Sequence, residues 1–209
     1  AFLWDEITRH EVQEYSAGDY DDGYVLEEEK ASTGSRITYP KFQTEFGTYV
    51  SFKHGVWDDD TGSYVDHALT VINMPVLKSH SIYQVTAALK NYMGVVSDYL
   101  TGHDAHNSVG RGFMGTQMAG SRVPDLNVMD AIWINPRRGP STPYSQAVET
   151  GIVAVSRDPC ALDFWAAKHV LMPAAEDVGN WRADTMDPAA DEPITFGYWL
   201  SLSHQELVA

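Results

Sequence analysis

The strongest constraint on the fold is a β-branched apolar run that ends at a proline. The predicted strand Ala68–Met74 lies in this run and stops at Pro75, a pattern typical of a strand buried on both faces. Apolar residues then recur at helical spacing, which predicts a helix over residues 83–93. Two further short runs, Leu126–Ile134 and Gly151–Ser156, predict neighbouring strands. This alternation predicts a single α/β domain with a mainly parallel or mixed sheet flanked by helices.

The remaining segments suggest additions to this domain. Residues 19–66 are acidic, rich in Gly and Tyr, and locally alternating, so they predict an irregular β-rich insertion. The chain opens on a predicted strand at residues 1–5 and a helix at 7–17, and this abrupt start suggests a missing N-terminal half. Residues 173–209 predict a tail that packs back on the domain. A single domain over residues 1–209 is therefore expected.

The charge and cysteine content exclude several classes of function. The chain has 14 Lys and Arg residues against 29 Asp and Glu, a net charge of −15, which would repel nucleic-acid phosphates. Its acidity fits a salty habitat, a cationic partner or simple solubility. Cys160 is the only cysteine, so this chain alone can form neither an intrachain disulfide nor an iron–sulfur cluster.

The sequence leaves the location of the protein open. No apolar run is long enough to cross a bilayer as a helix. Both a cytoplasmic protein and a protein exported after removal of its signal would look like this.

Four segments carry a resemblance to a known family. Asn73–His80 and the following Val85–Gly94 match the pattern N-x-P-x-L-K-[ST]-H and then V-T-x-A-L-K-N-x-M-G. Asp125–Ile132 and Ser156–Asp163 match a later strand and a helix start. In these segments, and over roughly residues 1–172, the chain resembles domain-of-unknown-function family 362.

The resemblance implies an α/β protein whose reaction is unknown. Some members of this family carry iron–sulfur ferredoxin modules, which implies a possible redox association. The N-terminal half of the family, with its additional strands and a lysine-bearing loop, is absent from this chain. A site shared between the two halves would be incomplete here, and the missing segment or another protein is a candidate partner.

The motif supplies the main candidate site residues. Lys78 and Lys90 are cations close to a predicted strand end and a helix C-terminus, where both could attract a carboxylate or a phosphate. We take them as candidate catalytic residues, and His80 and Asn91 as ligand-binding candidates. The alternative is that the lysines are solvated or form internal ion pairs.

Three histidines offer a possible divalent metal site. His80, His103 and His106 lie in successive predicted loops, and His103 and His106 could present two imidazoles to one ion if their loop turns helically. Exposed loop histidines are the competing interpretation.

Three aspartates are attached to the predicted sheet framework. Asp158 precedes Pro159, and this pair predicts a helix that begins at the proline with Asp158 as its N-cap. Asp163, one turn later, could form a salt bridge with a motif lysine, whereas Asp130 in a strand needs a hydrogen-bond partner if it is buried. Asp130 and Asp163 are also ligand-binding candidates.

Two hypotheses for function follow. In the first, an enzyme or redox-associated protein binds a small anionic molecule or a metal near Lys78, His80 and Lys90, which we expect to converge around a pocket beyond the end of the Ala68–Met74 strand. In the second, the chain is a non-catalytic scaffold or subunit with an acidic interaction surface. The sequence contains no nucleophile elbow, P-loop or dinucleotide-binding turn after a buried strand.

Overall fold

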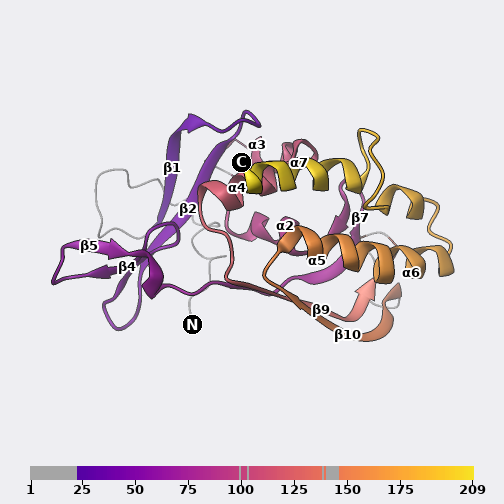
Figure 1. Cartoon of the computed structure of the whole chain (residues 1–209), viewed down its shortest axis with the longest axis horizontal. Coiled ribbons are helices and arrows are strands. Elements are labelled where there is room, and N and C mark those ends of the chain that lie inside the picture. Colours follow the sequence, from indigo (N-terminus) through magenta and orange to yellow (C-terminus); the bar gives the residue numbers. More distant parts are fainter. Residues whose placement is uncertain (1–22, 99, 103, 138, 140–145) are drawn as a thin grey trace.

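The computed structural model describes residues 23–98, 100–102, 104–137, 139 and 146–209. The strand predicted at residues 1–5 and the helix predicted at 7–17 lie outside these ranges. Figure 1 shows an antiparallel sheet with β1, β2, β4 and β5 on one side of the molecule and a body of helices and strands on the other.

The first sheet is an antiparallel meander in the order β1-β2-β3-β4-β5. Its strands are β1 (Gly23–Lys30), β2 (Arg36–Gln43), β3 (Tyr49–Ser51), β4 (Gly55–Asp58) and β5 (Ser63–Val65). Tyr39 and Phe52 turn inward and join the same hydrophobic core as the body. The described part of residues 19–66 therefore consists of these antiparallel strands and the turns between them, with a register shift in β1 between Leu26 and Lys30.

The body contains a second, mixed sheet. Its main strands run in the order β10-β9-β7-β8, and β6 also pairs with β9. The strands are β6 (Ile72–Asn73), β7 (Val76–His80), β8 (Gln84–Thr86), β9 (Leu126–Asn135) and β10 (Val148–Ser156). β9 pairs in parallel with β6 and β7, whereas β9 with β10 and β7 with β8 are antiparallel. The predicted α/β class is confirmed, and the three predicted strand regions lie in one sheet, which is mixed.

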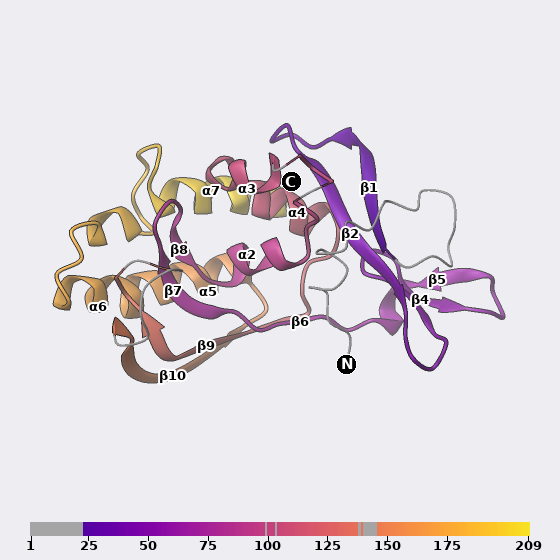
Figure 2. The ribbon, with the colours of Figure 1, turned by 180° about the vertical axis from the view of Figure 1, so that it is seen from behind.

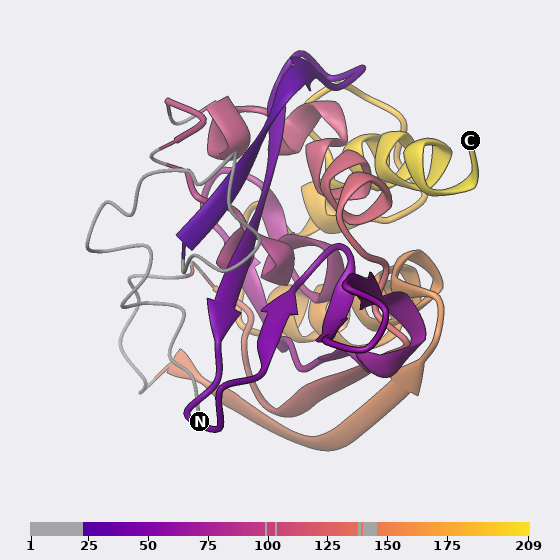
Figure 3. The same ribbon diagram turned by 90° about the vertical axis from the view of Figure 1, so that its left-hand side faces the viewer.

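Helices cover this sheet on one face. The helices of the described residues are α2 (Ala88–Asn91), α3 (Asp104–Asn107), α4 (Phe113–Gly120), α5 (Pro159–Ala166), α6 (Met172–Asp177) and α7 (Phe196–Val208), and short 3-10 turns lie at Asp66–Ala68, Tyr92–Gly94, Val109–Arg111 and Ala183–Met186. Figures 1 and 2, seen from opposite sides, place α2, α5 and α7 on the same side of β9 and β10. Figure 3 shows β10 curving along the outside of the body.

The one-sided cover corrects the prediction of a strand buried on both faces. Only Ile72 and Asn73 of the Ala68–Met74 run are in a strand, and Ile72 and Met74 are 54% and 69% exposed. Val153 and Val155 of β10 are exposed as well. The apolar run thus lies on an open sheet face, because no helix among the described residues packs there.

The predicted helix over residues 83–93 is also corrected. The chain forms a hairpin of β7 and β8 first, and only Ala88–Asn91 is α-helical, followed by one 3-10 turn. Val85 and Thr86 are β-branched and favour the strand. The predicted loop with Lys78 and His80 is consequently strand β7.

The helix start at Asp158 is confirmed. Its carboxylate accepts a 2.9 Å hydrogen bond from the N–H of Ala161, and Pro159 occupies the first turn of α5. α5 continues through a π-helical turn at Ala167–Leu171 into α6. Pro173 lies just after this wider turn. The wider turn leaves room for the proline ring and tolerates the backbone N–H that proline lacks.

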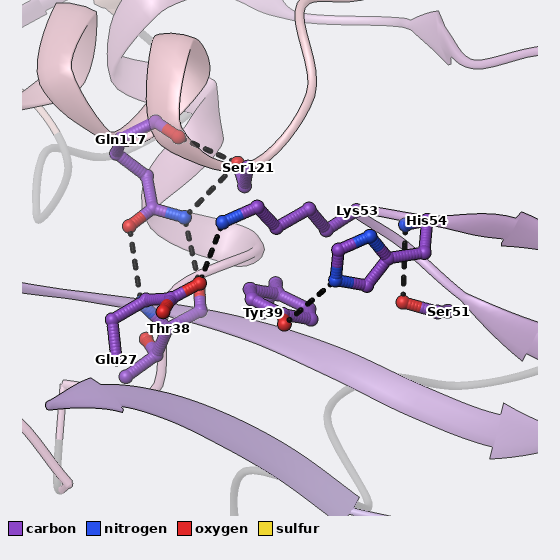
Figure 4. Close-up of polar contacts among 8 residues, drawn as sticks. All are labelled: Glu27, Thr38, Tyr39, Ser51, Lys53, His54, Gln117 and Ser121. Carbon is purple, nitrogen blue, oxygen red and sulfur yellow. Dashed lines mark hydrogen bonds and ion pairs between the residues drawn. The ribbon is translucent and has the colours of Figure 1, made fainter. Parts of the chain in front are cut away.

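Side chains from the body hold the meander in place. Gln117 of α4 pairs with the main chain of Thr38 in β2, accepting from its N–H at 3.4 Å and donating to its C=O at 2.7 Å (Figure 4). Arg122 donates to the C=O of Phe52 at 2.9 Å and forms an ion pair with Asp66. The meander is thus anchored to the body by polar contacts as well as by the shared core.

α7 packs closely on α4. A Cβ on Gly115 would collide with the backbone of Ser203, so glycine permits this approach. Phe196, Trp199 and Leu200 of α7 are buried. Residues 173–209 therefore supply most of α6, a 3-10 turn and α7, whose buried residues complete the core.

Candidate functional site

The β7–β8 hairpin places four polar residues on one face. Lys78 lies opposite Thr86, and His80 lies opposite Gln84 in the antiparallel register, so these pairs point to the same side of the sheet. Leu77, which alternates with them, is buried in the core. The regular alternation of a strand thus presents Lys78 and His80 together.

The tautomer of His80 follows from its contacts. Its Nδ1 lies 3.1 Å from the backbone N–H groups of both Ile82 and Tyr83. Both groups are donors, so Nδ1 accepts, and the proton of the neutral ring is on Nε2. Burial and the nearby charges of Lys90, His106 and Lys78 lower the pKa of His80 to about 4. At neutral pH, His80 is therefore an uncharged ring whose Nε2–H is a donor.

Lys90 joins this face from α2. It is buried, and its ammonium lies 5.6 Å from the ring centroid of Tyr83. Burial and the charge of Lys78 lower the pKa of Lys90 to about 8. The structure thus brings Lys78, His80 and Lys90 close enough to interact electrostatically. Within the part of the chain that the structure describes, neither lysine has an ion-pair partner.

Two of the three histidines in the predicted metal site, His80 and His106, are among the described residues. The ring centroids of His80 and His106 are 6.4 Å apart, while His103 lies outside the described residues. The proton on Nε2 of His80 leaves that nitrogen without a lone pair for a metal ion. Among the residues with described positions, no group of three or more His, Cys, Asp or Glu could hold a metal.

Asn91 belongs to a ladder of amides. It donates to Asn73 at 2.7 Å, and Asn73 donates in turn to Asn127 at 2.9 Å and to the C=O of Ala88 at 3.0 Å. This ladder ties α2 to β6 and β9. Asn73 and Asn127 are the buried members, and the hydrogen bond to Asn73 gives Asn91 a structural position at the end of the ladder.

The two aspartate candidates occupy different environments. Asp163 is fully buried and accepts from the N–H groups of Ala88 and Leu89 at 2.6 and 2.9 Å. The salt bridge predicted between Asp163 and a motif lysine is therefore not formed, because the carboxylate faces the first turn of α2. Burial raises the pKa of Asp163 to about 7. Asp130 is exposed on β9 and accepts from the N–H of Ile132 at 2.9 Å.

A cavity adjoins His80 at the turn of the hairpin. It has a volume of about 150 Å³, and its wall contains His80, Ser81, Gln84, Arg137, Asn180, Trp181, Arg182, Thr185 and Met186. Arg182 reaches over the turn and donates to the C=O of Ser81. Lys78 and Lys90 are not part of the wall, so His80 is the residue shared by the lysine pair and the cavity. This arrangement joins two lysines and two arginines around one histidine.

Sequence reasoning missed the arginines and Gln84. Arg137 and Arg138 form an adjacent cationic pair after a predicted strand in an acidic chain, and this pair was the available signal for Arg137. Gln84 and Arg182 carry no comparable pattern. Their role in the wall arises from the hairpin turn and from the 3-10 region after α6.

Comparisons with known proteins agree with this architecture. A family model described as a domain of unknown function, DUF362, matches residues 29–168. A thylakoid-associated protein of Synechocystis sp. is 32% identical over 130 residues, which cover 55% of this chain and 39% of that protein. The chain thus spans well under half the length of this relative. No solved structure matches the present chain.

Neither of these matches states a reaction. Among the described residues, no helix is long and apolar enough to span a membrane. The family model covers more than half of the chain and includes both lysine motifs. The chain therefore belongs to the family of proteins that share the domain of unknown function DUF362.

Proposed function

We propose that this chain binds a small anionic molecule in the cavity beside His80. The observation that carries the proposal is the concentration of positive charge at this point of a chain whose net charge is −15. Lys78 and Lys90 act electrostatically on His80, and Arg137 and Arg182 line the cavity next to it. Unpaired cations around a concave site favour an anionic ligand.

The state of His80 supports an anion over a metal ion. Because Nδ1 accepts two backbone N–H groups, the ring offers a hydrogen-bond donor at Nε2. A donor suits the oxygen of a carboxylate or phosphate, whereas a metal requires a lone pair. The nearby lysines would also repel a divalent cation.

Cys160 does not support thiol redox chemistry. It is buried, and burial with the nearby charges of Asp163 and Asp158 raises the pKa of its thiol far above neutrality. The reactive form of cysteine is the thiolate, so the thiol of Cys160 serves packing in α5.

Calorimetric titration with inorganic phosphate tests the proposal, with chloride used to hold ionic strength constant. Arg137 lines the cavity and is exposed, so Arg137→Met should fold normally and weaken phosphate binding about 10- to 100-fold. Arg157→Met removes the same charge from an exposed site outside the cavity wall and should leave binding unchanged.

A second pair of variants tests the lysines. Lys78→Met should weaken phosphate binding about two- to fivefold, because its charge acts through space. Lys53→Met, in the meander, is the matched control. If wild type binds neither phosphate nor acetate at tens of millimolar, or if each variant matches its control, the proposal is wrong.

The scaffold alternative rests on a different observation. The outer face of the second sheet exposes Ile72, Met74, Val153 and Val155, and an open apolar face marks a contact surface more often than a solvent surface. Light scattering over a range of protein concentrations tests it. The scaffold hypothesis would be favoured if the wild-type protein self-associates, if Val153→Lys abolishes this association, and if the wild-type protein does not bind phosphate.

A further inference from the structure

The outer face of the second sheet carries a patch of exposed apolar side chains. This outer patch consists of residues that are 41–69% exposed, namely Ile72, Met74, Val76, Ile132, Val153 and Val155. The helices α2, α5 and α7 lie on the opposite face of the sheet (Figures 1 and 2). None of the patch residues is in the wall of the cavity beside His80, so the anion site does not explain their exposure. A contiguous exposed apolar patch marks a contact surface.

One carboxylate lies inside the outer patch. Asp130 is exposed on β9, and the strand register places it between Val76 of β7 and Val153 of β10. Paired residues of neighbouring strands share one face of a sheet. Val128 and Ile132 lie two positions away on β9 and therefore face the same side. Asp130 is thus surrounded by apolar side chains, and it forms no ion pair with any residue that the structure describes.

The position of Asp130 restricts what can cover the patch. A closed contact between two copies of the chain would join the same patch from each copy, and it would bring two Asp130 carboxylates into one contact. The net charge of −15 on each copy adds to this repulsion. A wholly apolar partner would bury the carboxylate without a counter-charge, which is unfavourable. The occupant must therefore combine an apolar surface with a cation.

The sheet indicates the form of this occupant. β9 pairs in parallel with β6 and β7, and parallel strands are usually covered by helices on both faces. β9 has 10 residues, which span about 33 Å, and a helix of about 22 residues has this length. Asp130 is the fifth residue of β9. The counter-charge of Asp130 therefore belongs near the middle of a helix that lies along β9.

We propose that the outer patch binds an amphipathic α-helix of a partner protein, whose apolar stripe is interrupted near its middle by one lysine or arginine that pairs with Asp130. The aliphatic stem of this side chain packs on Val76 and Val153, and its cationic end reaches the carboxylate. The proposal is independent of the anion site, and it gives the scaffold hypothesis a partner of defined chemistry.

Selection from a displayed peptide library tests the proposal on the full chain. Each peptide is a helix of about 22 residues with an apolar stripe of Leu, Ile, Val and Met, and one central position of the stripe varies among all the standard amino acids. More than about half of the peptides selected on wild type should carry Lys or Arg at that position, about fivefold above the unselected library. Selection on Asp130→Lys should instead enrich Asp and Glu.

Fluorescence anisotropy with one selected, cation-bearing peptide then locates the contact. At about 0.15 M salt, Asp130→Lys should weaken its binding at least about tenfold, because like charges then meet in the contact. Glu176→Lys makes the same charge change at an exposed position on α6 and should change binding less than about twofold.

A second pair of variants tests the apolar part of the patch. Val153→Glu places a charge in the patch and should weaken binding of the same peptide at least about tenfold. Val208→Glu is its matched control, at an exposed valine of α7. Melting curves identify a variant that fails to fold, and the residue preference of the peptides selected on wild type stands without any variant.

Three outcomes would overturn the proposal. The first is that no peptide is selected on wild type, or that the selected peptides show no enrichment of Lys or Arg. The second is that the selected peptide binds Asp130→Lys and Val153→Glu as tightly as it binds their controls. The third is self-association of wild type that Val153→Glu abolishes, because a second copy would then be the occupant. Phosphate titration tests the anion site separately from all three.

Discussion

Among the described residues, two clusters that each combine a lysine, a histidine and a tyrosine differ in how the charge of the lysine is compensated. In the meander, Lys53 lies 5.6 Å from the ring of Tyr39 and forms a 2.6 Å ion pair with Glu27 (Figure 4). In the hairpin site, Lys90 lies at the same distance from the ring of Tyr83, but it is paired with no described carboxylate.

The two clusters differ in what the carboxylate of a neighbouring element binds. Glu27 on β1 reaches Lys53 because the meander brings β1 alongside its neighbours. The buried carboxylate of Asp163 instead binds the N–H groups at the start of α2, the helix that carries Lys90. The meander cluster is internally compensated, whereas Lys78 and Lys90 of the hairpin cluster have no ion-pair partner among the described residues.

The largest expected effect comes from removing the carboxylate of Asp163. Asp163→Ala leaves the buried N–H groups of Ala88 and Leu89 without their partner, which should cost about 2–6 kcal/mol of unfolding free energy. Urea denaturation measures the loss. Asp177→Ala, at an exposed position on α6, should stay within about 0.5 kcal/mol of wild type. A loss below about 1 kcal/mol for Asp163→Ala would show that α2 does not depend on this anchor.

The pH dependence of stability should have opposite signs at the two titrating groups. The pKa of Asp163 is raised to about 7, so the folded state holds the proton more tightly than the unfolded state. The contribution of Asp163 to the unfolding free energy therefore falls as pH rises from about 4 to 7. The pKa of His80 is lowered to about 4, so the contribution of His80 to the unfolding free energy falls as pH falls from about 6.5 to 4. Asp163→Asn and His80→Asn should remove these slopes separately in melts across pH 4–8.

Removing the charge at Lys90 should stabilise the protein. Lys90→Met should gain about 1–3 kcal/mol near pH 7, because a buried charge without an ion partner is eliminated. The folded pKa of about 8 lies below the unfolded value of 10.5, so the penalty is relieved as pH rises through that window and the gain should shrink. Denaturation at pH 7 and pH 10 tests both parts. A loss of stability at pH 7 would mean that Lys90 is compensated after all.

The cap at Asp158 should have a moderate effect. Asp158→Ala should cost about 0.5–2 kcal/mol, because the N–H of Ala161 loses its acceptor. Asp158→Asn, which retains an acceptor oxygen, should recover most of that loss in thermal melts. Unchanged stability together with weakened anion binding would instead indicate that Asp158 contacts the ligand.

The ion pair in the meander should contribute least. Lys53 and Glu27 are each about a third exposed, so a double-mutant cycle with Lys53→Met and Glu27→Gln should give a coupling of about 0–1 kcal/mol that salt weakens. A coupling above about 2 kcal/mol would contradict the view of this cluster as a surface pair.

Parts of the fold were predictable because their causes are local. The Asp158–Pro159 pair specifies a helix start through contacts within one turn, and the strands β9 and β10 follow from short β-branched runs. The predicted helix over residues 83–93 was wrong because the same apolar spacing also suits a strand, a turn and a short helix. The choice depended on the hairpin pairing of β7 with β8.

The sequence by itself determined the family, the mixed α/β class and the motif that supplies Lys78, His80 and Lys90. Only the tertiary structure decided which lysine is compensated and which residues share a cavity. Arg137 and Arg182 reach the turn next to Gln84 from segments about 50 and 100 residues away. Capping and strand propensity act over a few residues, whereas charge compensation and cavity shape depend on long-range strand pairing and helix packing.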